Sequence, residues 1–129
     1  MNIGDVNKKT LLKILDWCKE KYGPSKFNSM NTLKLRVNNR IKGECGNYTP
    51  VNNTIYVNIT AHDSLIEVID TVIHEYVHFR QDIKNKYHKL YMETYSYNVD
   101  NHPYEKTAYG VALNDRRECY NDLFTKKYE

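Results

Sequence analysis

The sequence predicts one domain of the α+β class. Residues 64–81 place apolar side chains at the spacing of a buried α-helix, and residues 54–59 alternate apolar with polar side chains as a strand does. The strand candidates lie in the middle of the chain, with helix candidates on both sides. We therefore expect a small antiparallel sheet of about three strands, an N-terminal helix and two further helices after the sheet.

Length, charge and cysteine content limit the kind of protein this is. The chain has 129 residues, which suits one compact domain, 1–129, and we expect a monomer. A net charge of +3 is too small to indicate nucleic-acid binding, and no apolar run has the length of a membrane-spanning helix. The N-terminus lacks a signal-peptide pattern, so we expect a cytoplasmic protein. Its cysteines are too few and too far apart for a disulfide framework: Cys18, Cys45 and Cys119.

The first helix is expected to begin after Asp5 as its capping residue and to end near Tyr22. Gly23 and Pro24 then stop it. Its apolar residues recur at helical spacing and predict one buried face, formed by Leu11, Ile14, Leu15, Cys18 and Tyr22. This helix is predicted to pack on the sheet and to take no part in chemistry.

The middle of the chain predicts three strands. Residues 33–37 alternate, Asn38-Asn39 is a turn candidate, and residues 40–48 can pair back onto the first strand. A second turn at 50–53 leads into residues 54–59. The alternation there predicts that Ile55, Val57 and Ile59 face the core, whereas Tyr56 and Asn58 do not. One edge strand is expected to border the functional cleft, because an extended peptide can add to a free edge.

The helix predicted over residues 64–81 contains the motif H-E-x-x-H, from His74 to His78. Ser64 and Glu67 have the spacing of a capping box at its start. Residues four apart in a helix lie one turn above each other, so both imidazoles leave the same face and can hold one zinc ion. Glu75, at the border of that polar face, can take a proton from a water that zinc binds.

A polar, tyrosine-rich stretch separates this helix from the last one. A short helix over 87–94 is expected within it. Pro103 suits the first position of a helix, which makes His102 the expected cap and predicts a final helix to about Thr125.

Catalytic zinc usually has three protein ligands, so a third ligand is expected outside the motif. Glu105 is the strongest candidate because it lies in the first turn of the last helix. Ala108 and Ala112 follow on its face, and small side chains allow two helices to approach closely. His102 is the alternative ligand. The remaining histidines are His62 and His88.

The order of these residues resembles the gluzincin family of zinc metallopeptidases: an H-E-x-x-H motif, then about two dozen residues, then a glutamate that opens a second helix. The chain length is similar to that of the minimal single-domain members, the minigluzincins. The run Y-S-Y-x-x-x-x-x-P-Y-E-x-x-A, Tyr95 to Ala108, also looks like small phage-type metallopeptidases. The resemblance covers about residues 64–112 and implies a zincin-like fold. It also implies one Zn²⁺ ion with Glu75 as general base and three ligands, His74, His78 and Glu105.

One position departs from the family pattern. Larger gluzincins carry an acidic residue four positions after the glutamate, where it orients a histidine, but this chain has Tyr109 there. Asp70, one turn before His74, or a backbone carbonyl is the alternative partner. Tyr97 and Tyr109 are the candidates for stabilising the oxyanion or contacting substrate.

The predicted function is the hydrolysis of peptide bonds in a peptide or protein substrate. Zinc would polarise the scissile carbonyl and activate a water, and Glu75 would pass the proton of that water to the leaving amine. One alternative is a catalytically weak or inactive zinc-stabilised module that binds another protein and does not need Glu75. Nucleic-acid binding is indicated only by the lysines of residues 84–89, which are more typical of a solvated surface.

Overall fold

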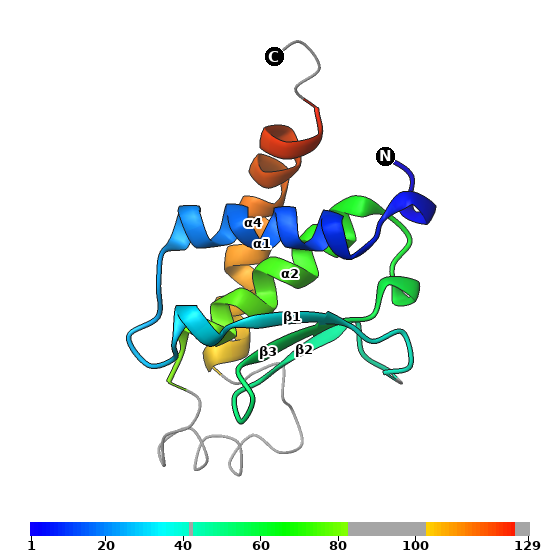
Figure 1. Ribbon diagram of the computed structural model, residues 1–129. Helices are drawn as coiled ribbons and strands as arrows, with labels where there is room; N and C mark the ends of the chain where they lie inside the picture. The colour runs from blue at the N-terminus through cyan, green and yellow to red at the C-terminus, as the bar shows by residue number, and fades with distance from the viewer. Residues whose placement is uncertain (42, 83–102, 126–129) are drawn as a thin grey trace.

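The computed structural model describes residues 1–41, 43–82 and 103–125. Their helices are α1 (Lys8–Tyr22), α2 (Leu65–Arg80) and α4 (Pro103–Phe124), and their strands are β1 (Lys34–Val37), β2 (Gly46–Thr49) and β3 (Thr54–Val57). Short 3-10 helices are η1 (Ile3–Asp5), η2 (Met30–Thr32) and η3 (Ile59–Ala61). The prediction of the α+β class is confirmed (Figure 1). The helix expected over 87–94 and the capping role of His102 lie outside the described residues.

The sheet is mixed, with strand order β1-β3-β2. β2 pairs antiparallel with β3, with Tyr48 opposite Ile55, and the predicted turn at 50–53 joins them. In that turn Asn53 adopts a positive φ of 51°, which asparagine tolerates better than most residues. β1 pairs parallel with β3, with Leu35 also opposite Ile55. The expectation of an antiparallel sheet is therefore wrong for β1.

The connection between β1 and β2 explains the parallel pairing. Asn38-Asn39 does not turn the chain back, and the described residues of 40–48 do not pair with β1. Instead, Asn38 donates its backbone N–H to the carbonyl of Val57, at the end of β3 (2.9 Å). Asn58 donates its own N–H to the carbonyl of Cys45 (2.8 Å). These bonds hold the connection across the end of β3, so the chain has passed to the other side of β3 when β2 begins.

The central strand buries the side chains that its alternation predicts, but only as far as the strand extends. Ile55 and Val57 have no exposed surface, which confirms their core positions. Ile59 lies in η3 and is only partly buried against the core. Asn58 was expected to point outward, yet it is 6% exposed, because its amide donates to the carbonyl of Ile41 (3.0 Å). The alternation ends where the strand ends, at Val57.

The N-terminal helix has the predicted inner face and a different start. Asn7, not Asp5, caps α1: its side-chain oxygen accepts from the N–H of Thr10 (3.1 Å), and the Thr10 hydroxyl accepts from the N–H of Asn7 (3.4 Å). Asp5 lies in η1. The helix ends at Gly23, whose φ of 76° is the left-handed conformation that favours glycine.

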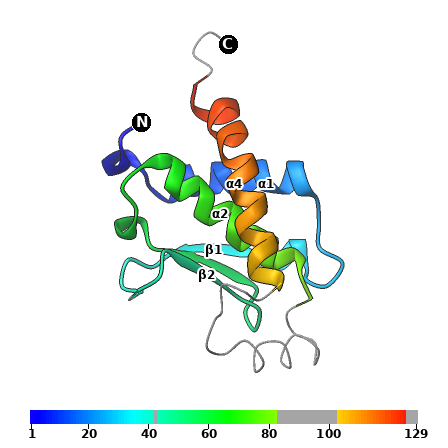
Figure 2. The same ribbon diagram turned by 180° about the vertical axis from the view of Figure 1, so that it is seen from behind.

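α2 is the central element of the fold. It contacts α1, α4, β2 and β3, and most of its side chains are buried. α1 and α2 lie on the same face of the sheet, and the opposite view shows α4 running across α2 (Figure 2). Gly46 allows β2 to lie against this helix, because an added Cβ would come within 2.9 Å of the Thr71 methyl group and 2.6 Å of the Tyr56 carbonyl oxygen. Within the described ranges, no helix is long and apolar enough to cross a membrane.

Candidate metal centre

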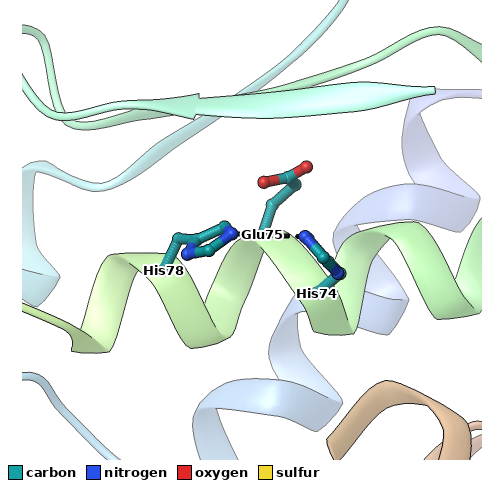
Figure 3. Close-up of side chains that lie close together, drawn as sticks. All are labelled: His74, Glu75 and His78. Atoms are coloured by element: carbon teal, nitrogen blue, oxygen red, sulfur yellow. Dashed lines mark hydrogen bonds between the residues drawn. The ribbon is translucent and has the colours of Figure 1, made fainter. Parts of the chain in front are cut away.

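The two motif histidines are positioned by α2. Ser64 caps this helix, and its hydroxyl accepts from the N–H of Glu67 as predicted. The Glu67 carboxylate, however, accepts from the N–H of Asp63 rather than from that of Ser64. His74 and His78 lie one turn apart on the resulting helix, and their Nε2 atoms are 3.2 Å apart. Figure 3 shows the imidazoles turned towards each other along the helix. Both nitrogens are therefore close enough to share one ion.

Glu105 reaches the same point from α4. Its Oε2 lies 3.4 Å from Nε2 of His74, and its Oε1 contacts Nε2 of His78. Ala108 and Ala112, the small residues that follow it, have no exposed surface, which agrees with the expected close approach of the two helices. The candidate metal centre formed by His74, His78 and Glu105 is called the metal centre from here on, for brevity.

The charges of the metal centre depend on each other in the metal-free protein. Burial by itself would raise the pKa of Glu105, but hydrogen bonds from His74 and His78 outweigh it and hold that pKa well below the ordinary value. Burial would lower the pKa of His78, whereas its bond to Glu105 and the charge of Glu75 raise it. The Glu105 carboxylate thus favours a proton on His78 in the metal-free protein, and a cation can take the place of that proton.

Glu75 is buried beside the metal centre. It extends from α2 towards the strand that passes over the helix (Figure 3), and its side chain is only 6% exposed. Burial raises the pKa of Glu75 to about 7, although the nearby charges of His74 and His78 act in the opposite direction. One ligand-type atom from each of His74, Glu75 and His78 lies within 4.8 Å of the others. Glu75 is therefore near enough to exchange a proton with a molecule held there.

Two further residues contact the histidines. The ring of Tyr109 packs edge-on against His74, with centroids 4.6 Å apart, and Tyr109 remains about half exposed. The side-chain oxygen of Gln81 lies 2.7 Å from Nδ1 of His78. Sequence reasoning predicted a role for Tyr109 and missed Gln81, whose only signal was its position three residues after His78.

The other predicted site residues have separate outcomes. The carboxylate of Asp70 pairs with Arg116 at 3.0 Å, so its described partner is on α4 and is not His74. His62 uses both ring nitrogens elsewhere, on the carbonyl of Asn58 and the hydroxyl of Thr71, each at 2.7 Å. It is therefore no ligand of this centre. The remaining candidates lie outside the described residues: His88, Tyr97 and His102.

The donor set fits zinc. Two imidazole nitrogens and one carboxylate are a common protein ligand set for catalytic zinc, which keeps its fourth position for water or substrate. The two imidazole side chains are 12% exposed and that of Glu105 is 19% exposed, so the centre is shielded but not closed. Comparison with known proteins adds nothing to this chemistry, because no family model, curated protein or solved structure matches the chain.

Proposed function

We propose that the protein is a zinc-dependent peptidase of the gluzincin type. The observation that carries this proposal is the contact of one Glu105 carboxylate with Nε2 of both motif histidines, across two helices. His74, His78 and Glu105 would hold the ion. A zinc ion bound there supplies Lewis-acid chemistry, polarising a peptide carbonyl and making a water acidic.

Glu75 has the properties of the general base. Its carboxylate is beside the histidines, and a buried carboxylate with a pKa near 7 binds and releases a proton readily at neutral pH. It would accept a proton as water oxygen attacks the peptide carbon, and it would return that proton to the nitrogen as the carbon–nitrogen bond breaks. A site that only stabilises the fold does not need a buried carboxylate, whose desolvation is unfavourable. This difference favours an enzyme over a binding module.

The sheet offers a place for an extended substrate. In the described part of the chain β2 pairs with β3 alone, so no described strand occupies its other edge. Its first residue, Gly46, lies against Thr71 of α2, one helical turn before Glu75. A peptide that added to β2 as a further strand would therefore pass beside the metal centre. Such binding uses backbone hydrogen bonds, so it selects an extended peptide rather than a particular side chain.

The proposal is tested by measuring zinc content and turnover on a mixed peptide library. Removing any one ligand, as in Glu105→Ala, should lower zinc content sharply. Glu75→Gln keeps the shape but cannot accept the proton, so zinc should remain while hydrolysis falls by orders of magnitude. His102→Ala is the matched control and should keep its zinc. Zinc loss in His102→Ala but not in Glu105→Ala would overturn the ligand set, and full zinc without wild-type turnover would indicate a binding module.

A further inference from the structure

We propose that Gln81 is the residue that prepares the metal centre: it fixes the proton of His78 on Nδ1 and ties His78 to the helix that carries Glu105. This inference rests on the proposed zinc site and adds a positioning residue to it. Three features of the contacts around Gln81 support it.

The first feature is the orientation of the Gln81 amide. Its nitrogen lies 3.1 Å from the backbone carbonyl oxygen of Tyr104, and a carbonyl can only accept a hydrogen bond. The NH₂ group of the amide must therefore face Tyr104. The amide oxygen is then left to face Nδ1 of His78, at 2.7 Å. Because the Tyr104 carbonyl accepts only from the amide nitrogen, the atom of Gln81 that points to His78 must be the amide oxygen.

The second feature is the proton on His78 that this orientation requires. An amide oxygen has no hydrogen to give, so Nδ1 of His78 must be the donor. Nε2 is then the nitrogen whose lone pair can bind a metal, and Nε2 is the atom that faces His74 and Glu105. The hydrogen bond also fixes the plane of the imidazole ring.

The third feature is the position of Gln81 in the chain. It is the C-cap of α2, where its N–H donates to the carbonyl of His78 (3.1 Å). Its own carbonyl accepts from the amide of Asn28 (3.2 Å), which also binds the carbonyl of Phe79 (2.7 Å). The backbone of Gln81 is thereby held on two sides, so little further entropy is lost when its side chain makes its two bonds.

The bond to Tyr104 has a further consequence for assembly of the centre. Gln81 and Tyr104 lie at the two ends of the connection 82–103, and Tyr104 immediately precedes Glu105. The bond therefore keeps the first turn of α4 beside the end of α2 and places Glu105 next to His78 before an ion arrives. A ligand set that is already assembled binds its metal more tightly than one that must be ordered on binding.

The test uses two variants that separate the two bonds. Gln81→Ala removes both. Gln81→Glu keeps an acceptor for His78 but loses the donor for Tyr104. Asn52→Ala is the matched control, because it removes an exposed amide that bonds the Tyr56 hydroxyl (3.0 Å). Two readouts that do not require turnover are measured: the zinc dissociation constant by chelator competition, and the proton on Nδ1 of His78 by ¹H–¹⁵N NMR of the imidazoles.

In wild type we expect a slowly exchanging His78 Nδ1 proton, with and without zinc. Gln81→Ala should lose that signal to solvent exchange and bind zinc about 10- to 100-fold more weakly. Gln81→Glu should keep the signal and bind zinc more tightly than Gln81→Ala, and Asn52→Ala should match wild type. Wild-type affinity together with an unchanged proton signal in Gln81→Ala would overturn the inference. Zinc binding without peptide hydrolysis would end only the peptidase proposal, whereas a wild type that binds no zinc would end both.

Discussion

Tyr109 packs its ring edge-on against the imidazole of His74, so a residue of α4 covers one side of a predicted zinc ligand of α2. Tyr109 stands four residues after Glu105, on the same side of that helix, and about half of its surface is exposed. The tyrosine can therefore brace His74 with its ring and meet a substrate with its hydroxyl. These two roles are separable by mutation.

Tyr109→Phe keeps the ring and removes the hydroxyl. We expect zinc content to stay at the wild-type level, while kcat for peptide hydrolysis falls about 10²- to 10³-fold, as for the loss of an oxyanion donor. Metal analysis and steady-state kinetics on the same preparation provide the comparison. Tyr120→Phe, on the same helix and packed against Phe124, is the control for removing a tyrosine hydroxyl. Unchanged kcat in Tyr109→Phe would leave Tyr109 with a packing role alone.

Glu75→Gln should stabilise the zinc-free protein at neutral and alkaline pH. The folded pKa of Glu75 is raised to about 7 from an ordinary 4.5, so ionising the buried carboxyl weakens the fold progressively between these values. Glutamine removes that penalty. The gain should be absent near pH 4, grow to pH 7 and then stay level at a magnitude on the order of 3 kcal/mol. Urea unfolding at several pH values measures it, with Glu67→Gln on the same helix as control. A gain that does not depend on pH would contradict the burial of an ionisable Glu75.

The sequence predicted α2 well because this helix has a complete local signal. Residues 64–81 combine a capping serine with an apolar face, and α2 runs from Leu65 to Arg80. Glu105 could be predicted because its small neighbours permit close helix packing, and the contact with both histidines follows from that approach. Both predictions depend only on residues within one or two helices.

The sheet could not be predicted in the same way, because its topology depends on contacts between distant segments. Asn38-Asn39 looks like a hairpin turn, and only the bond from Asn38 to Val57 shows that the chain crosses the end of β3 instead. Gln81 was missed for a similar reason. Nothing near it in sequence reveals that its amide bonds Tyr104, on the far side of the connection 82–103.

Charged substitution at the centre of the sheet should unfold the protein. Val57 has no exposed surface in β3, the strand that pairs on both sides, and Val57→Asp would bury a carboxylate without a partner. Circular dichroism should then show loss of the cooperative thermal transition. Tyr56→Asp, one position earlier on a partly exposed side chain, should still fold. A folded Val57→Asp would contradict the register that places Val57 opposite Val37 and Gly46.

Arg116→Ala should leave zinc binding unchanged. Arg116 and Asp70 form a partly exposed pair, with side chains 35% and 28% exposed, and such pairs contribute at most about 1 kcal/mol. We therefore expect a small loss of thermal stability and a normal zinc dissociation constant. Lys21→Ala is a comparison variant, since it breaks a similar pair with Glu118 between α1 and α4. If Asp70→Asn weakened zinc binding tenfold while Arg116→Ala did not, Asp70 would have to orient His74 after all.

Stability should respond to pH in opposite directions with and without zinc. In the zinc-free protein, the folded pKa of Glu105 is lowered from 4.5, so its contribution is present above that value and is lost only in stronger acid. The folded pKa of His78 is raised from 6.5, so its contribution is complete below 6.5 and is lost as pH rises through the folded value. Ionisation of the buried Glu75 adds a further loss between pH 4.5 and 7, so zinc-free protein should be most stable near pH 4.5 and weaken steadily as pH rises.

Added zinc should oppose this loss of stability at higher pH. Zinc binds only deprotonated ligands, so it takes the place of the proton that His78 shares with Glu105. The increase in unfolding free energy on adding zinc should therefore grow from pH 5 to pH 8. Urea unfolding with excess chelator and with excess zinc measures both curves. Glu105→Gln removes the carboxylate that raises the pKa of His78, so its zinc-free curve should decline less over this range. Zinc-free stability that rises from pH 5 to pH 8 in the wild type would contradict the pairing of Glu105 with His78.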